Sequence, residues 1–195
     1  MQIGNLTSYT DLTGKYERYV PIGTYTVSYT PTGVYASYPL TTASSNSVSV
    51  VGVGITYQGG NYGLDLPAGS TNLAVNLLPH TTVTPGFPAW YDIQVCNIGI
   101  NPTGATVTMN YDPGLTYTFG SPVPTSVNTT AHVITWNLPT MTSGQCLYIQ
   151  ADFSASTSYQ IGDPTFEFCS AYPTSGTDID LTNNTDTVHQ IVTGS

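Results

Sequence analysis

Two stretches of this chain decide its fold: WYDIQVCN at residues 90–97 and CLYIQADF at residues 146–153. In both, apolar and polar side chains alternate with a period of two, which predicts a β-strand that buries one face. The predicted inward residues are Tyr91, Ile93 and Val95 in the first stretch, and Leu147, Ile149, Ala151 and Phe153 in the second. The predicted outward residues are Trp90, Asp92, Gln94 and Cys96, and Cys146, Tyr148, Gln150 and Asp152.

Further short segments of this kind follow one another along residues 69–195, and no segment has a clear helical period. Turn signals such as DPG, TSGQ and PTSGTD separate them. Seven or eight strands at this spacing predict an immunoglobulin-like β-sandwich. The predicted strands are 72–78, 90–97, 104–111, 115–119, 132–138, 146–154, 165–172 and 186–193.

The first part of the chain also alternates, in KYERYVP (15–21), GTYTVSY (23–29), NSVSVVGVGITYQ (46–58) and GGNYGLDL (59–66). In the turn TDLTGKY we expect Asp11 to cap and Gly14 to take the left-handed conformation. A Pro/Gly/Ser joint at 66–70 marks a domain boundary. We therefore expect an all-β chain of two tandem β-sandwich domains, residues 1–68 and 69–195.

The chain is poor in charge and rich in hydroxyl groups. Charged residues make up 7% of its 195 residues, against roughly 25% in an average soluble domain, while there are 33 threonines and 15 tyrosines. A net charge of −9 with only two basic residues argues against nucleic acid as a partner, because nothing would neutralise phosphates. No apolar run is long enough to span a membrane. This composition is typical of an extracellular or cell-surface scaffold or binding surface.

Several short motifs carry a family resemblance. YDIQVCNIG, YDPGLTY, ITWNLPTMTSGQ and DIDLTNNT lie within residues 88–193, which resemble the conserved-repeat β-sandwich of large bacterial surface proteins. TDLTGKY, GTYTVSY and NYGL lie within residues 10–64, which look like the later part of a Cna-B or carboxypeptidase-regulatory module. The pair in this order is similar to segments of secreted proteins with type IX sorting domains.

The resemblance implies that the first module lacks its initial strand or strands, because only nine residues precede Thr10. Both ends of the sequence suggest a piece of a longer protein. A missing strand leaves an edge with unpaired backbone groups, which can pair with another chain. We expect either strand exchange between copies or completion by a neighbouring segment of the parent protein.

The three cysteines allow more than one pairing. In an immunoglobulin-like sheet, the strands that contain Cys96 and Cys146 are adjacent and antiparallel, which places these residues opposite each other within disulfide range. The alternatives are a bridge across the core from Cys96 to Cys169, which needs Cys96 to face inward, and three reduced thiols. We predict the Cys96–Cys146 bridge, with Cys169 a buried free thiol.

Three groups of side chains are candidate sites. The same register places an aromatic and polar patch on the outside of the sheet, a mixture that sugar binding uses; its alternative is an ordinary solvated face. A dense set of oxygen-bearing residues could bind calcium as cofactor, although its spacing does not match an EF-hand, or could simply cap a loop. Asp186-Thr187-Val188 resembles a bacterial O-glycosylation site at Thr187. The patch comprises Trp90, Asp92, Gln94, Tyr148 and Gln150, and the calcium set Asp178, Asp180, Asn183, Asn184 and Asp186.

No catalytic motif stands out, and His80, His132 and His189 lack metal-site spacing. We therefore expect a non-catalytic structural or adhesive segment of an exported bacterial surface or filament-like protein. The alternative is a carbohydrate-binding module attached to a secreted hydrolase. The expected partners are other copies of the chain, neighbouring domains of a parent protein, or a polysaccharide.

Overall fold

The computed structural model describes residues 1–10, 14–32, 35–36 and 38–194. It divides into two compact units, Met1–Ala68 and Gly69–Ser195. Gly69, at the joint, has a φ of 78°, in the left-handed region that favours glycine. Both units are built from β-strands, which confirms the all-β fold class. Among the described residues, no helix is long and apolar enough to cross a membrane.

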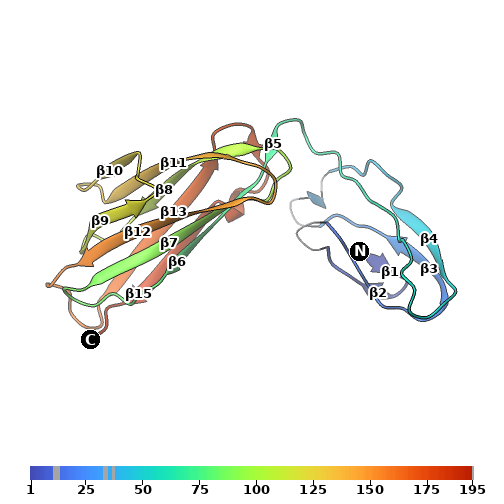
Figure 1. The fold of residues 1–195 in the computed structure, drawn as a ribbon, viewed down its shortest axis with the longest axis horizontal. Helices are drawn as coiled ribbons and strands as arrows, with labels where there is room; N and C mark the ends of the chain where they lie inside the picture. The colour runs from blue at the N-terminus through green and yellow to red at the C-terminus, as the bar shows by residue number, and fades with distance from the viewer. Residues whose placement is uncertain (11–13, 33–34, 37, 195) are drawn as a thin grey trace. The chain divides into compact units, whose positions relative to one another are not determined.

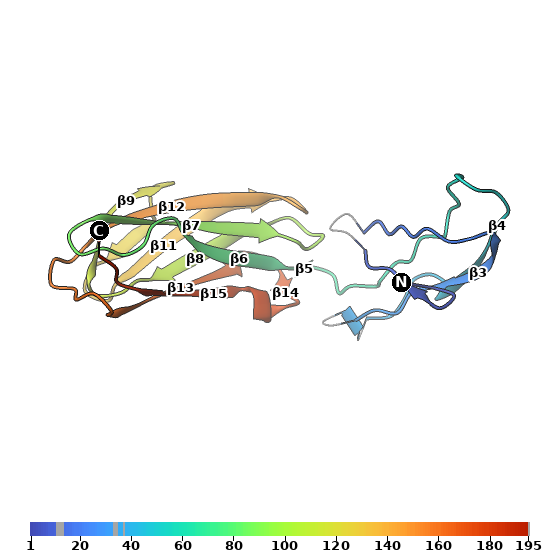
Figure 2. The ribbon, with the colours of Figure 1, turned by 90° about the horizontal axis from the view of Figure 1, so that it is seen from below.

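The second unit is an antiparallel β-sandwich. One sheet contains Ser126–Asn128 (β10), Val133–Met141 (β11), Thr103–Asn110 (β8), Pro164–Pro173 (β13) and Thr185–Ile191 (β15), in that order. The other contains Leu73–Pro79 (β6), Pro88–Asn97 (β7), Cys146–Ala155 (β12) and Leu115–Ser121 (β9). Figures 1 and 2 show the two sheets as packed layers. A short parallel pair, Ser70–Thr71 (β5) with Thr177–Asp178 (β14), and a 3-10 helix at Leu181–Asn183 (η2) complete the unit.

The core lies between these sheets, on the faces that the alternation predicted. Tyr91, Ile93 and Val95 of β7 are fully buried, as are Ile149 and Ala151 of β12. Burying apolar area of this kind is the main stabilising contribution to the fold. The immunoglobulin-like sandwich is therefore confirmed, with β7 and β12 as adjacent antiparallel strands.

The first unit has a different architecture. Its strands, Gln2–Ile3 (β1), Leu6–Thr7 (β2), Gly23–Ser28 (β3) and Ser45–Val50 (β4), form one antiparallel sheet with the order β2-β1-β3-β4. Among the described residues of this unit there is no second sheet, and only the isolated bridge Leu40–Leu64 lies outside the first. Irregular segments therefore take the place of a second layer.

Two strands predicted in the first unit do not form, and a third is shorter than predicted. Residues 15–21 and 59–66 form no regular strand, and the third strand ends at Val50 instead of continuing to residue 58. Glycine is frequent in residues 51–66, although 15–21 contains none, and it weakens a strand because it costs backbone entropy and offers no side chain to pack. Gly54 and Gly60 both have positive φ, which turns the chain away from an extended path.

The remaining expectations for this unit concern β3 and the turn before it. Val27 is buried while Thr24 and Thr26 are exposed, so the alternation of β3 is confirmed. Gly14 has a φ of 78°, which is the left-handed conformation that the TDLTGKY sequence predicts for it. Asp11, the predicted capping residue, lies outside the described residues.

Candidate functional site

The outer face of the β6-β7-β12-β9 sheet is the first candidate site, and we call it the sheet face. The register across β7 and β12 pairs Gln94 with Tyr148, Asp92 with Gln150 and Trp90 with Asp152. Trp90 is 39% exposed and Tyr148 59% exposed. All five residues of the predicted patch are therefore brought together on one surface, in the predicted register. Ligand binding there stays a prediction.

Side-chain hydrogen bonds hold this face in a fixed arrangement. Gln94 donates from Nε2 to the Tyr148 hydroxyl (2.7 Å) and accepts at Oε1 from Asn76 of β6 (3.2 Å). The His80 Nε2 atom lies 2.7 Å from Asp92 Oδ2. Gln150 donates to Asp152 Oδ1 (2.8 Å). The bond from Gln94 crosses from β7 to β12 and fixes the Tyr148 hydroxyl, while Tyr148 stays largely exposed to solvent.

A third exposed aromatic residue on the sheet face escaped the sequence analysis. Phe119 of β9 lies opposite Asp152 and is 53% exposed. The next pair across these strands is Phe153 with Tyr117, so Thr118 forms a β-bulge. The bulge lets Tyr117 pack against the core while Phe119 faces outward. Strict alternation would place both rings on one face, and no signal in the sequence marks the bulge.

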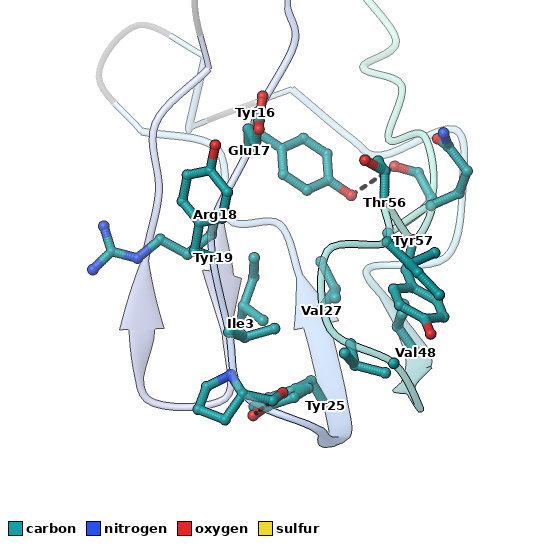
Figure 3. A pocket seen from close by; sticks show the side chains of 18 of the residues that line it. Ile3, Tyr16, Glu17, Arg18, Tyr19, Tyr25, Val27, Val48, Thr56 and Tyr57 are labelled. Carbon is teal, nitrogen blue, oxygen red and sulfur yellow. Dashed lines mark hydrogen bonds between the residues drawn. The ribbon is translucent and has the colours of Figure 1, made fainter.

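The second candidate site is a groove of about 880 Å³ in the first unit, which we call the groove. Ile3, Val27 and Val48 from three neighbouring strands line it beside the aromatic rings of Tyr16 and Tyr57 (Figure 3). Irregular segments 14–22 and 52–61 complete the lining. The groove therefore occupies the side of the sheet where a second layer would pack in a sandwich.

Tyrosine hydroxyl groups tie these irregular segments together. Tyr16 donates to the Gly60 carbonyl (2.9 Å), and Tyr25 donates to the Pro21 carbonyl (2.9 Å). The Tyr57 hydroxyl accepts from the backbone N–H of Val51 (3.1 Å). Burial, with a smaller contribution from Tyr62, raises the pKa of Tyr16, so its phenol stays protonated and able to donate. These contacts replace part of the packing that a second sheet would supply.

Both basic residues of the chain line the groove. Lys15 lies 3.6 Å from the Glu17 carboxylate in an exposed ion pair. Arg18 is exposed next to Tyr19, which is 90% exposed. The groove thus combines aromatic rings and cations. No sequence pattern marks it, because it is built from segments whose alternation predicts strands.

The disulfide lies at one end of the sheet face. Cys96 and Cys146 are bonded, with a Cα–Cα separation of 4.0 Å, and they are direct partners in the β7–β12 register. The predicted pairing is therefore confirmed, and the alternatives are wrong. Cys169 is a buried free thiol, as predicted. Burial, reinforced by Asp186, raises its pKa to about 12, which keeps the thiol protonated and unreactive.

The oxygen-rich set at 178–186 forms backbone hydrogen bonds. Asp178 Oδ2 accepts from the N–H of Leu73 (2.9 Å), and Asp186 Oδ2 accepts from the N–H of Leu77 (2.8 Å). Asp180 caps η2. The two carboxylates at 178 and 186 therefore fasten the C-terminal segment to β6.

The two asparagines of the same set are similarly engaged. Asn183 donates to the Asn72 side chain (2.9 Å), and Asn184 donates to the Ala171 carbonyl and to Asp178. Among the described residues, no group of three His, Cys, Asp or Glu side chains could hold a metal ion. The geometry supports the loop-capping alternative, and calcium binding stays an untested prediction.

Thr187 lies on β15, opposite Phe168 in the ladder to β13. Its side chain is exposed, so a modifying enzyme could reach it. Glycosylation of Thr187 stays a prediction.

Comparisons with known proteins give similarities of fold alone. No family model matches the chain, and no curated protein matches it. Among solved structures, the CARDB domain of the PF1109 protein from Pyrococcus furiosus is 12% identical, with a TM-score of 0.46, over 63% of this chain and 88% of that one. A cohesin module of a family 33 glycoside hydrolase from Clostridium perfringens is 8% identical, with a TM-score of 0.46, over 64% of this chain and 99% of that one. These similarities carry no argument about what this chain binds or does.

Proposed function

We propose that this chain is a non-catalytic structural and adhesive segment of an exported bacterial surface protein, and that copies associate along the edge of β4. The main support for this proposal is the exposed edge of the sheet in the first unit. β4 is the last strand of its sheet, and the chain continues from it into Val51, Val53 and Ile55. These three side chains are 75%, 89% and 61% exposed.

An edge strand presents a row of backbone N–H and C=O groups that can pair with another strand. Natural edges are often protected by lysine, by proline or by a covering loop. Residues 45–55 contain neither charge nor proline, and their exposed apolar side chains would be buried by an added strand. A second copy is therefore the proposed occupant of this edge.

Three features support the wider setting of the proposal. A disulfide is typical of proteins in oxidising compartments outside the cytosol. The low content of charged residues suits an anchored protein whose solubility rests on hydroxyl groups. The motif resemblance favours a conserved-repeat sandwich that follows a partial Cna-B-like module, in a parent protein of the type IX secretion class.

The oligomeric state in solution tests this proposal. Light scattering after size exclusion, over a range of concentrations, should give a mass that rises from one chain towards two or more. Val53→Lys with Ile55→Lys should shift the equilibrium to the monomer, because these exposed side chains directly follow the end of β4 and charge there opposes their burial by an added strand. Val123→Lys is the matched control, since Val123 is similarly exposed (84%) but lies in the second unit. A chain that stays monomeric throughout would contradict the proposal.

One observation favours carbohydrate binding as a second candidate function. The sheet face carries three exposed aromatic rings, Trp90, Phe119 and Tyr148, beside fixed amide and carboxylate groups. Aromatic rings offer apolar faces and amides offer hydrogen bonds, and pyranose sugars present both kinds of partner. Trp90 also provides an intrinsic fluorescence signal for a bound ligand.

A glycan array with the folded chain, followed by titration of any hit, tests this second function. Trp90→Ala and Tyr148→Ala should each abolish binding. Tyr172→Ala is the control, because Tyr172 is 48% exposed on the other sheet. Absence of any hit, or equal loss in the control, would remove this candidate.

A further inference from the structure

Thr165 and Gln190 are direct partners in the antiparallel ladder between β13 and β15. Thr165 is 1% exposed and faces the interior. Its hydroxyl group is buried without a hydrogen-bond partner of standard geometry among the described residues. Since directly opposed residues have Cβ atoms about 4.5–5.5 Å apart, the hydroxyl and the carboxamide are neighbours.

Two hydrogen bonds from other strands and loops fix the Gln190 carboxamide. Its Oε1 atom accepts from the Tyr91 hydroxyl (2.7 Å), and its Nε2 atom donates to the Thr81 carbonyl (2.9 Å). Tyr91 is fully buried in the core. A fixed donor at a carbonyl oxygen in a dry site stabilises the negative charge that develops there when a nucleophile attacks the carbon. The carboxamide is thus oriented and polarised.

Glu167 lies two residues beyond Thr165 on the same inward face of β13 and is fully buried. Neither carboxyl oxygen has a hydrogen-bond partner of standard geometry among the described residues. Burial raises the pKa of Glu167 to about 7; the hydroxyls of Tyr91 and Thr165 oppose this rise, while the charge of Asp112 adds to it. Both protonation states are therefore populated near neutral pH, as a group that takes and returns a proton requires.

Thr165 thus supplies a nucleophile, Glu167 a proton carrier and Gln190 a polarised carbonyl. We propose that Thr165 Oγ1 and Gln190 Cδ become joined by an intramolecular ester bond that covalently links β13 to β15. The proposal is independent of the chain's partner or ligand, and it concerns a modification within the second unit.

The reaction balances without an oxidant or a second substrate. Thr165 Oγ1 attacks Cδ of Gln190 as its proton passes to the ionised Glu167 carboxylate, and the Tyr91 hydroxyl stabilises the resulting oxyanion. The Cδ–Nε2 bond then breaks, and Glu167 returns the proton to the departing nitrogen. One C–O bond forms, one C–N bond breaks, and one molecule of ammonia leaves. Burial of the site protects the ester from hydrolysis.

Mass spectrometry of the full chain, expressed, folded and incubated at pH 7, tests the proposal. The intact mass should be lower than that of the disulfide-bonded sequence by one ammonia. After proteolysis, a branched peptide should join the segment of Thr165 to that of Gln190, and hydroxylamine should cleave it. The branched peptide separates this product from cyclised terminal glutamine or asparagine succinimide, which lose the same mass.

Three variants complete the test. Thr165→Val should retain the full mass, and Glu167→Gln should form the link roughly 100-fold more slowly, as expected for loss of a proton carrier. Thr187→Val, an exposed threonine on β15, should form the link like the unchanged chain. Folded unchanged protein with the full mass and no branched peptide would overturn the proposal, as would a Thr165→Val variant that still loses ammonia and still yields a branched peptide at Gln190.

Discussion

The two units of this chain show two ways in which charge-poor, hydroxyl-rich strands hold together. In the second unit, two sheets bury a continuous core, and a disulfide joins two neighbouring strands. In the first unit there is one sheet, and tyrosine hydroxyls hold irregular segments over part of its face. Only Ile3, Val27 and Val50 are buried apolar residues among the described positions of this unit. In this chain, period-two alternation therefore yields a closed core only in the unit where a second patterned sheet is present.

The largest expected effect comes from opening the core of the second unit. Phe153→Ala removes a fully buried ring that contacts Tyr91 and Tyr111. We expect a loss of about 3–5 kcal/mol in the free energy of unfolding, from lost burial and a new cavity. Urea denaturation followed by tryptophan fluorescence measures it, because Trp90 and Trp136 both belong to this unit. A loss below about 1 kcal/mol would contradict a packed core at this position.

The disulfide gives the next largest effect. Replacing Cys96 and Cys146 by serine releases a constraint over 50 residues of chain, and we expect destabilisation of about 2–4 kcal/mol. The same urea experiment measures the change. Tyrosine fluorescence or amide exchange of the first unit should stay unchanged, since the bridge lies wholly in the second unit. Equal destabilisation of both units would contradict an effect confined to the second unit.

Glu167 makes the stability of the second unit depend on pH. Burial raises the pKa of its carboxyl from 4.5 to about 7, so the folded state favours the protonated form. The contribution of the protonated carboxyl to the free energy of unfolding is complete below about pH 4.5. It is lost as the pH rises through 7, and the loss amounts to up to about 3 kcal/mol. Denaturation from pH 4 to 9 measures the slope.

Glu167→Gln should remove this pH dependence and be the more stable protein above pH 7. Both proteins should carry Thr165→Val, so that no covalent link between the strands contributes. An equal slope in the two proteins would show that other groups cause the pH dependence.

The smallest effect concerns the first unit. Tyr16→Phe removes the hydrogen bond to the Gly60 carbonyl, and we expect a loss of about 1 kcal/mol. Tyr19→Phe is the control, because Tyr19 is 90% exposed. Amide exchange across residues 52–61 should increase in the first variant and not in the second. Equal exchange in both would mean that this hydroxyl does not hold the segment.

The sequence was most informative where burial separates the two faces of a strand. The predicted strand 146–154 is observed as Cys146–Ala155, and the pairing of Cys96 with Cys146 follows from its register. The strands predicted at 15–21 and 59–66 were wrong. Tyrosine in these segments uses its hydroxyl group for a hydrogen bond from an irregular segment, as Tyr16 and Tyr62 do, so alternation does not require a strand. Composition alone does not separate these two uses of tyrosine.

The candidate sites were only partly predictable for a similar reason. The sheet face follows from alternation, but Phe119 depends on a bulge that shifts the register by one residue. The groove needs segments 14–22 and 52–61 to meet, which no local pattern encodes. The cluster around Glu167 arises from residues of β7, β13 and β15, and only the tertiary structure brings them together.

We propose that the second unit is closed, while the first unit has an edge that accepts another chain. Hydrogen–deuterium exchange at low and high protein concentration tests it most directly. We expect the amides of Ser45–Val50 and of Val51–Ile55 to become more protected as the concentration rises, while those of β7 and β12 stay equally protected throughout. Protection of 45–55 that does not change with concentration would contradict the claim.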